Sequence, residues 1–351
     1  MKFKALNIDG LIAKYPIVQG GMGVGISLSD LAGHVALAGG VGVISTAQIG
    51  FREEGFASNP LETNLKAIKK YIDKAREIAK GGVIGVNIMV ATKHYEEYVK
   101  AAVRAGVDLI ISGAGLPTTL PKLVENTKTK IAPIVSSVKS ARVICKLWDK
   151  HYGKTPDMVV IEGPKAGGHL GFSKDEVENI TDEDYEKEIV AIKEVVDEYG
   201  EKYQKHIPVV FGGGVYDKAD MEHYMGLGID GVQMGTRFVT TYECDAAEGY
   251  KQAYIDATKE DIRIVKSPVG MPGRAIYNKF MAQSELENHP IKKCYQCING
   301  CKAKDIPYCI TDALVKAANG DTENALLFCG SNAYKSNKIE HVSDIFEELL
   351  S

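Results

Sequence analysis

The chain has 351 residues, of which 45% are hydrophobic, 25% charged and 8% aromatic. This is the composition of an ordinary globular protein, and it excludes disordered, collagen-like and fibrous classes. The 42 Lys and Arg residues against 46 Asp and Glu residues give a net charge of −4. Because the electrostatic footprint of a nucleic-acid-binding protein is absent, we expect no nucleic-acid partner. The length suits one large α/β barrel with an appendage.

The amino-terminal residues indicate where the protein is located. Two lysines are not followed by an apolar core of signal-peptide length, so we expect a cytoplasmic protein. The longest apolar stretch, residues 31–50, contains His34 and paired glycines, and it ends before the ~20 apolar residues that span a bilayer. We therefore expect no membrane segment. Seven cysteines without an export signal favour reduced thiols or a metal site over a disulfide framework.

Short runs rich in β-branched residues end in Gly, Ser, Asn or Glu and alternate with amphipathic segments along most of the chain. The predicted strands are 15–22, 41–45, 83–89, 108–115, 130–137, 157–163, 207–214 and 230–236. The predicted helices between them include 60–80, 95–105, 141–151, 185–199 and 218–227. Because the strands are apolar along nearly their whole length, both faces of their sheet are expected to be buried under helices.

The number of strands favours one fold class. Eight strands joined by helical crossovers over about 235 residues match a (β/α)8 TIM barrel, although a doubly wound open sheet would give a similar pattern. We favour the barrel because nearly every predicted strand ends in Gly, Ser, Asn or Glu. A barrel gathers the carboxyl ends of all its strands in one mouth, where such residues can form a site. We place the barrel in residues 1–242. Residues 243–351 are predicted to form a helical or irregular, Cys-containing segment that covers the mouth.

The strongest site signal lies at the ends of the seventh and eighth predicted strands, in FGGGVYD (211–217) and VQMGTRF (232–238). Glycines let main-chain N–H groups approach an anion closely, and barrels bind phosphate at the loops after these strands. We therefore expect a phosphate site there, formed by Gly213, Gly214, Gly235 and Thr236. A tight turn without a ligand is the alternative explanation of the glycine run.

The first predicted strand is followed by GGMGVG (20–25), which resembles the dinucleotide fingerprint GxGxxG only superficially. The spacing differs, and the next strand ends at Ser45 rather than at the acidic residue that holds a ribose. We interpret Gly20, Gly21 and Met22 as main chain that lies flat against a planar ligand, where a Cβ would collide. A flavin ring is such a ligand.

Three polar residues at strand ends complete the candidate site. Asn87 interrupts an apolar strand, and its amide needs either a ligand or neighbouring main chain as a partner. The sixth strand ends at Glu162 and is followed by PKAGGHLGF (164–172). We predict that His169 is catalytic and that its flanking glycines hold it on flexible main chain. Imidazole is the side chain whose unperturbed pKa best suits proton transfer near neutrality.

Together PIVQGGMG, GVNI, EGPKAGGHLG, VFGGG and QMGTRF, in this order, resemble the nitronate monooxygenase family, which includes the FabK-type FMN-dependent enoyl-acyl-carrier-protein reductases. The similarity extends over about residues 10–280. It implies an FMN-binding (β/α)8 barrel with a smaller second segment, in which His169 is the active-site histidine. The implied FMN contacts are Gly20, Gly21, Met22, Asn87, Glu162, Gly167, Gly214, Gln233, Met234, Gly235 and Thr236, to which we add Gly168 and Gly213 from the same loops.

The resemblance implies two reactions. Our main prediction is a nitronate monooxygenase that oxidises alkyl nitronates with O2. The alternative is an NADH-dependent enoyl-acyl-carrier-protein reductase, because Glu162 stands where monooxygenases of the family often have glutamine. A barrel that binds FMN without turnover is a distant third. The substrate is accordingly expected to be a nitronate or an enoyl thioester. Arg274 is a further residue that could shape the mouth of the barrel. The sequence leaves open whether the protein is a homodimer.

Four cysteines lie close together near the carboxyl terminus. Cys294, Cys297, Cys301 and Cys309 have the spacing C-x2-C-x3-C-x7-C. Thiolates at short spacing can bind zinc or an iron–sulfur cluster, but this spacing matches neither common iron–sulfur runs nor a zinc ribbon. We expect no metal and interpret the region as a reduced Cys-rich lid, since free cysteine packs as a small hydrophobe.

Overall fold

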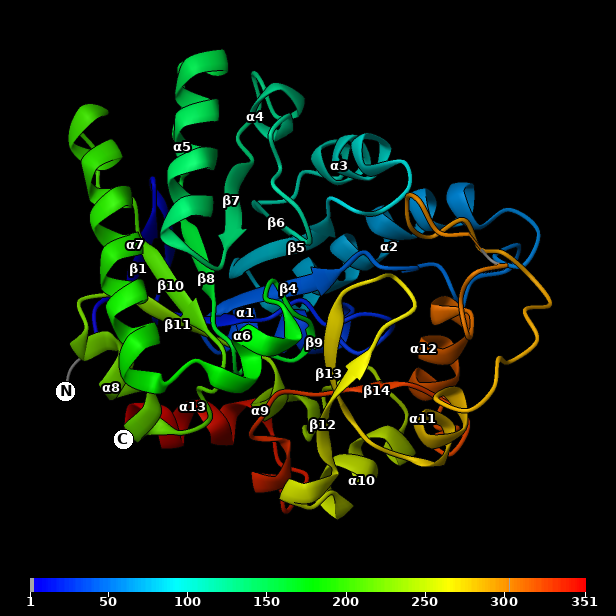
Figure 1. Ribbon diagram of the computed structural model, residues 1–351. Coiled ribbons are helices and arrows are strands. Elements are labelled where there is room, and N and C mark those ends of the chain that lie inside the picture. The colour runs from blue at the N-terminus through cyan, green and yellow to red at the C-terminus, as the bar shows by residue number, and fades with distance from the viewer. Residues whose placement is uncertain (1–2, 303) are drawn as a thin grey trace.

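The structure is a computed structural model, and it describes residues 3–302 and 304–351. At its centre is a closed barrel of eight parallel strands (Figure 1). In chain order these are β3 (Ile17–Gln19), β4 (Val41–Ser45), β5 (Val83–Met89), β6 (Leu109–Gly113), β7 (Lys130–Val135), β8 (Val159–Glu162), β10 (Val209–Gly212) and β11 (Gly231–Met234). Neighbours pair in the order β10-β11-β3-β4-β5-β6-β7-β8, and β8 pairs with β10. The predicted barrel is confirmed, and each strand lies within one predicted run.

Helices follow the barrel strands and pack outside them. They are α1 (Ser29–Leu37), α2 (Pro60–Ala79), α3 (Tyr95–Arg104), α4 (Leu120–Leu123), α5 (Val138–Tyr152), α7 (Asp182–Lys202) and α8 (Lys218–Gly226). Local sequence explains where several of them begin. Asn59 caps α2 by accepting the N–H of Glu62, and Ser137, Thr181 and Asp217 cap α5, α7 and α8 in the same way.

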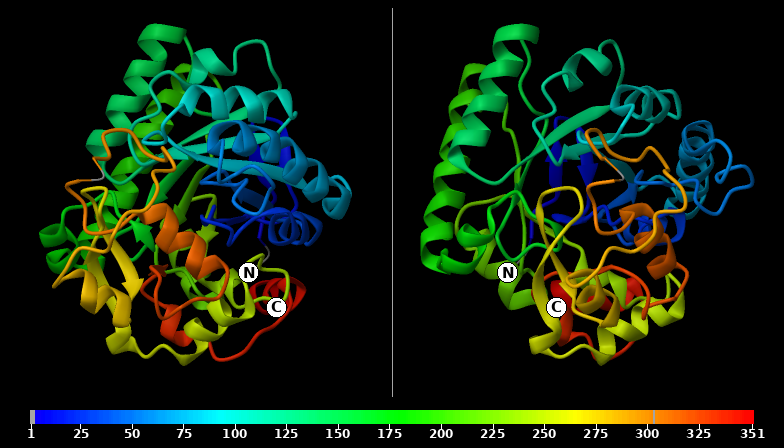
Figure 2. Two further views of the ribbon diagram at one scale, coloured as in Figure 1. Left: turned by 90° about the vertical axis from the view of Figure 1, so that its right-hand side faces the viewer. Right: turned by 45° about the vertical axis from the view of Figure 1, so that its right-hand side comes forward.

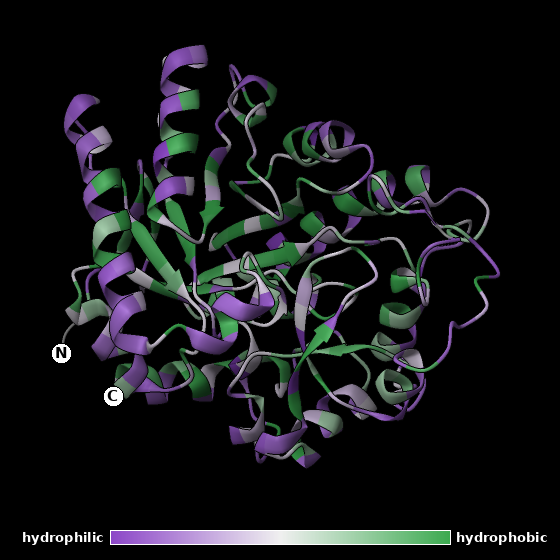
Figure 3. Cartoon of the chain, viewed as in Figure 1, coloured by the Kyte–Doolittle hydropathy of each residue, from purple (hydrophilic) through white to green (hydrophobic). Residues whose placement is uncertain are grey.

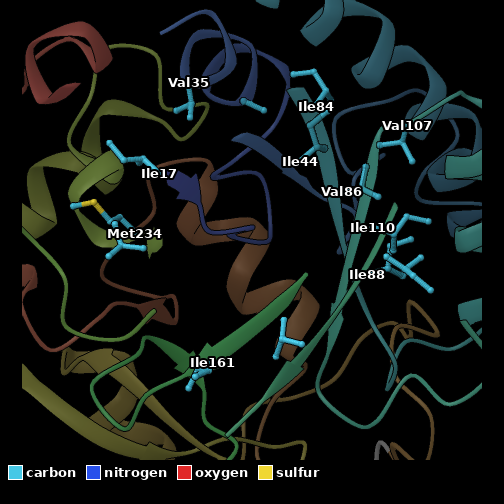
Figure 4. Packing of buried hydrophobic residues seen from close by; sticks show 14 of the residues in the cluster. Ile17, Val35, Ile44, Ile84, Val86, Ile88, Val107, Ile110, Ile161 and Met234 are labelled. Carbon is cyan, nitrogen blue, oxygen red and sulfur yellow. The ribbon is translucent and has the colours of Figure 1, made fainter. Parts of the chain in front are cut away.

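The main core lies between the strands and these helices. Ile44, Ile84 and Ile110 are fully buried there (Figure 4). The strands are largely hydrophobic, whereas the helices α5 and α7 carry many hydrophilic residues (Figure 3). A second cluster fills the barrel near the beginnings of its strands, where the hairpin of β1 (Leu6–Ile8) and β2 (Leu11–Ala13) packs against residues such as Val41 and Val83. The barrel is therefore closed at its amino-terminal end and open at the other.

The chain's last helix, α13 (Val342–Leu350), packs against α1 and α8. Its Phe346 belongs to the main core together with Ile17. The buried guanidinium of Arg237, just after β11, pairs with Glu340 and with Glu348, and so ties this helix to the barrel. The division at residue 242 stays a prediction, but α13 packs as part of the helical ring.

The rest of residues 243–351 contains a sheet that the sequence analysis did not predict. Its antiparallel strands are β12 (Ile262–Lys266), β13 (Pro272–Ile276) and β14 (Leu327–Phe328), and β13 also pairs with β9 (Gly168–His169) from the loop after β8. The expectation of a helical or irregular segment was wrong for these residues, because the strands are short and lack a sustained apolar run. Around them lie α6 (Lys174–Asn179), α9 (Thr236–Val239), α10 (Glu248–Asp256), η1 (Lys259–Asp261), α11 (Lys279–Ser284), α12 (Ile310–Ala318) and η2 (Ala333–Lys335).

The second segment, by which we mean residues 243–351 without α13, lies beside the loop that carries β9. The residues drawn in yellow and orange form one group on that side of the barrel in every view (Figures 1 and 2). A bridge between Thr92 and Ile298 attaches the group to the loop after β5 as well. In the part of the chain that the structure describes, no helix is both long enough and apolar enough to cross a membrane.

The packing of β4 on α1 gives a test of the fold. A Cβ on Gly42 would lie 1.8 Å from the carbonyl oxygen of Ala32, which is helix backbone and cannot easily move aside. We expect Gly42→Ala to lower the free energy of unfolding by about 3 kcal/mol or more, measured by urea denaturation. Gly226→Ala in α8 is the control, because a Cβ there would have no neighbour within 4 Å. Wild-type stability of Gly42→Ala would contradict this packing.

Candidate active site

A cavity of about 290 Å³ opens at the carboxyl ends of the barrel strands. The loops after β3, β5, β8, β10 and β11 line it, together with residues of the second segment. The predicted residues that line it are Gly20, Gly21, Met22, Asn87, Glu162, Gly167, Gly168, His169, Gly213, Gly214, Gln233, Gly235 and Thr236. Met234 does not line it: its side chain is buried in the main core. The fold therefore brings together every predicted site residue except Met234.

The glycines after β3 have two different roles. A Cβ on Gly21 would lie 2.3 Å from the Cβ of Asn87, so packing within the protein already requires glycine there. A Cβ on Gly20 would meet nothing closer than 3.7 Å. The main chain is held in place because the Gly20 N–H donates to the Met234 carbonyl at 2.9 Å and the Met22 N–H donates to Ser27 Oγ at 2.8 Å. Gly20 therefore presents bare main chain to the cavity.

Three of the lining's polar side chains that have no hydrogen-bond partner among residues 3–302 and 304–351 bear on ligand binding. They are the amides of Asn87 and Gln233 and the hydroxyl of Ser331, whose oxygen is buried. Polar groups in such positions are normally paired, so the unpartnered amides of Asn87 and Gln233 are available to a ligand. The alternative explanation of Asn87, an amide satisfied by neighbouring main chain, is not what the structure shows.

The loops after β10 and β11 form a concave surface together with residues 330–332, and we call this surface the anion cradle. Gly213 and Gly214 have φ angles of 129° and 96°, in the left-handed region that favours glycine. The Gly330 N–H donates to Thr236 Oγ1 at 3.0 Å, and Asn332 Nδ2 donates to the Gly214 carbonyl at 2.7 Å. A concave surface of glycine main chain with hydroxyls and amides suits an anion such as phosphate.

Sequence analysis missed residues 330–332. They follow β14 in the order FCGSN (328–332), which is again an apolar strand that ends in glycine and polar residues. The same signal led to the loops after β10 and β11, but β14 has two residues and no neighbour in the barrel pattern. The Ser331 N–H donates to the Lys165 carbonyl at 3.2 Å, so this segment also reaches the loop after β8.

Glu162 ends β8, and its carboxyl group lines the cavity. Its Oε2 accepts the N–H of Gly171 at 3.2 Å, which favours the charged form. Burial outweighs this hydrogen bond and raises the pKa of Glu162 to about 7. The Tyr185 hydroxyl donates to the Glu162 carbonyl at 2.7 Å and holds the end of the strand. The cavity thus contains a carboxyl group that changes charge near neutral pH.

His169 is held firmly, contrary to the prediction that its loop is flexible. Its strand β9 pairs with β13, in the register that places His169 opposite Gly273. The imidazole Nε2 lies 2.7 Å from Ser267 Oγ, and the ring contacts Phe328 edge-on with centroids 4.9 Å apart. Burial lowers the pKa of His169 to about 4, because water that would solvate the charged ring is excluded. The imidazole is therefore neutral at physiological pH.

The hydrogen bonds of Ser267 favour one position for the imidazole proton of His169. Ser267 is buried, and its Oγ accepts the N–H of Val269 at 3.4 Å. Among the described residues, His169 Nε2 is the one group within reach that could accept the hydroxyl hydrogen of Ser267, and it does so only when it carries no proton itself. We infer that the ring proton is on Nδ1, which leaves an N–H donor for a ligand.

Arg274 acts on the mouth from outside the cavity. It does not line the cavity; its buried guanidinium donates to the carbonyls of Pro164, at 2.9 Å, and of Ala166. These carbonyls belong to the loop that precedes Gly167 and His169. A Cβ on Gly167 would lie 2.6 Å from the main chain of Cys329, so this loop fits closely against the second segment. Arg274 therefore shapes the mouth indirectly, because it positions the loop after β8.

All seven cysteines are free thiols. Cys297 lines the cavity, whereas Cys294 and Cys301 are exposed. Among residues 3–302 and 304–351, no three His, Cys, Asp or Glu side chains are arranged to hold a metal ion. The cavity is also lined by a set of apolar side chains, here called its apolar wall, which includes Met89, Ile134, Ile298, Ile310 and Leu314.

The fold and the site define a class of protein: a (β/α)8-barrel enzyme with a glycine-lined polar cavity at its mouth. Comparison with known proteins gives the family. The family described as nitronate monooxygenase matches residues 5–351, and the chain belongs to it. A probable nitronate monooxygenase of Staphylococcus saprophyticus is 28% identical over 315 residues, which are 82% of this chain and 84% of the relative. The chain is accordingly an oxidoreductase of this family.

Two solved structures share the fold. FabK from Thermotoga maritima superposes with a TM-score of 0.73 at 25% identity, over 96% of this chain and 92% of that one. Nitroalkane oxidase from Streptomyces ansochromogenes superposes with a TM-score of 0.73 at 20% identity, over 96% of this chain and 95% of that one. The second similarity shows the fold alone.

The inferred proton position can be tested with Ser267→Ala. The 15N chemical shifts of the wild-type His169 ring at pH 6 are expected to be those of a neutral ring protonated on Nδ1. Without the hydroxyl donor, the variant should show a mixture of both neutral forms. Ser284→Ala is the control, because it removes the hydroxyl 3.0 Å from His289 Nε2 and should alter only that ring. A charged His169 at pH 6 would contradict the assignment.

Proposed function

We propose that the chain is an FMN-dependent nitronate monooxygenase, which oxidises alkyl nitronates with O2. One observation supports this most: a single cavity combines an anion cradle, unpartnered amides and the neutral imidazole of His169. FMN, when bound, would supply the transfer of electrons from the substrate and the reaction with O2. The chain supplies binding, orientation and the exclusion of water.

The residues of the cavity fit FMN at both of its ends. Main-chain groups of Gly213, Gly214 and Gly235, with the hydroxyls of Thr236 and Ser331, would hold the phosphate. The bare main chain from Gly20 to Met22 would lie against the flavin ring, and the unpartnered amides of Asn87 and Gln233 would bind its polar edge. Glu162, Gly167 and Gly168 are the remaining proposed contacts, from the loop after β8.

His169 would act on the substrate as a hydrogen-bond donor. A nitronate is an anion, and the Nδ1–H of a neutral imidazole can donate to one of its oxygens. With a pKa near 4 the ring is a weak base, so this role is favoured over removal of an α-proton from a neutral nitroalkane. Phe328 packs edge-on against the ring and limits the access of water to it.

The apolar wall favours a second candidate function. Met89, Ile134, Ile310 and Leu314 offer apolar surface that an acyl chain could occupy. The 25% identity to FabK from Thermotoga maritima points in the same direction. In this alternative the substrates are NADH and an enoyl thioester on an acyl carrier protein. A cytoplasmic location and a homodimer stay predictions from the sequence.

The two functions are separated by anaerobic bleaching of the flavin. Protein supplied with FMN is expected to lose its visible absorbance when an alkyl nitronate is added without nicotinamide, and to keep it when NADH is added. His169→Ala should remain coloured but bleach more than ~100-fold more slowly. His223→Ala is the control, because this imidazole pairs with Glu186 outside the cavity. Fast bleaching by NADH would assign the reductase, and protein that takes up no FMN would contradict both functions.

The pH dependence follows from Glu162. Below its raised pKa of about 7 the carboxyl is neutral, and above it the carboxylate repels an anionic substrate. We therefore expect kcat/KM for a nitronate to fall as the pH rises from about 6 to 8. In Glu162→Gln this fall should disappear, whereas Glu186→Gln should keep the wild-type profile. A profile of Glu162→Gln that still falls near pH 7 would assign the titration to another group.

A further inference from the structure

Lys165 is the one Lys or Arg among the described residues that line the cavity. It lies in the loop after β8, four residues before His169. Its ammonium pairs with the Asp182 carboxylate, at the start of α7, with Nζ and Oδ2 2.6 Å apart.

The stem of Lys165 lies against the anion cradle. A Cβ on Gly214 would be 3.0 Å from Lys165 Cδ and 3.2 Å from Lys165 Cβ. The Lys165 carbonyl accepts the N–H of Ser331, the residue with the unpartnered hydroxyl. Lys165 therefore touches two segments of the cradle. Its ammonium is two bonds beyond Cδ, so a change of side-chain rotamer would bring it to an anion held at Gly214.

A phosphate in this cradle would lack a full positive charge without Lys165. A phosphate monoester carries a charge of about −1.5 to −2 at pH 7, and the main-chain N–H groups and hydroxyls around it are neutral dipoles. The remaining charged group of the lining, Glu162, is an acid. An anion that leaves water for a partly enclosed site needs a counter-charge as well as hydrogen bonds.

We propose that Lys165 is the cationic ligand of the cofactor phosphate and that its ammonium exchanges Asp182 for the phosphate when the cofactor binds. The proposal rests on the proposed function, because it needs FMN in the cavity. The exchange is easy, since the side chains of Lys165 and Asp182 are 41% and 64% exposed and water screens such pairs. Lys165 then makes the site selective for a flavin that carries a phosphate.

The test is a titration of flavin-free protein with FMN and with riboflavin, followed by flavin fluorescence. We expect Lys165→Gln to weaken FMN binding about tenfold and riboflavin binding less than about twofold. Lys165→Arg should keep most of the FMN affinity. Asp182→Asn should tighten FMN binding about twofold to threefold, because the ammonium then has no competing partner. Lys202→Gln is the matched control: its Nζ pairs with Asp149 at 2.6 Å, away from the cavity, and both flavins should bind it as they bind the wild type.

Each outcome decides the proposal. Equal losses for FMN and riboflavin in Lys165→Gln would mean that Lys165 only supports its loop, and unchanged FMN binding would mean that it has no role. Either result overturns the proposal but leaves the proposed function intact, because wild-type protein still binds FMN. Unchanged FMN affinity in Asp182→Asn, a variant outside the cavity lining, would overturn the exchange even where Lys165→Gln failed to fold. Wild-type protein that binds neither flavin would overturn the proposed function and this proposal together.

Discussion

The hydrogen bond from the Gly20 N–H to the Met234 carbonyl joins the end of the first barrel strand to the end of the last. It continues the parallel pairing of β3 with β11, which closes a circle over more than 200 residues of sequence. Only this closure brings the glycines after β3 beside those after β10 and β11. An open sheet would keep the first and last strand ends apart, and the cavity would not exist.

The second segment completes the site that the barrel loops form in part. The pairing of β9 with β13 fixes the loop after β8, and Arg274 on β13 holds two carbonyls of that loop. Residues 330–332, which follow β14 of the same sheet, complete the anion cradle. One small sheet therefore positions His169 and the cradle together. A change that loosens this sheet would affect both ends of the site at once.

Sequence predicted the barrel and most of its mouth because the relevant signals are local. A buried parallel strand is an apolar run, and its end is marked by glycine or a polar residue, so the position of Glu162 or Gly214 could be read from a few neighbours. The pattern could not show which way each side chain points, because adjacent strand residues face opposite sides: Gln233 lines the cavity, whereas the side chain of Met234 enters the core. The contacts of Arg274 could not be predicted for another reason. Its partner Pro164 is 110 residues away in sequence, and a contact over such a separation cannot be predicted from a local sequence pattern.

The distribution of charge in the cavity follows from the same architecture. The buried imidazole is neutral, and the Glu162 carboxyl is near its pKa at pH 7, so most of the lining carries no fixed charge. Lys165 is the exception, and it lies at the cradle rather than at His169. A positive charge beside the imidazole would hold an anionic substrate tightly before reaction as well as during it, which lowers KM without raising kcat. With the Lys165 ammonium at the cradle, as proposed, the cavity would bind its ligand through a charge at one end and leave the neutral end free for turnover.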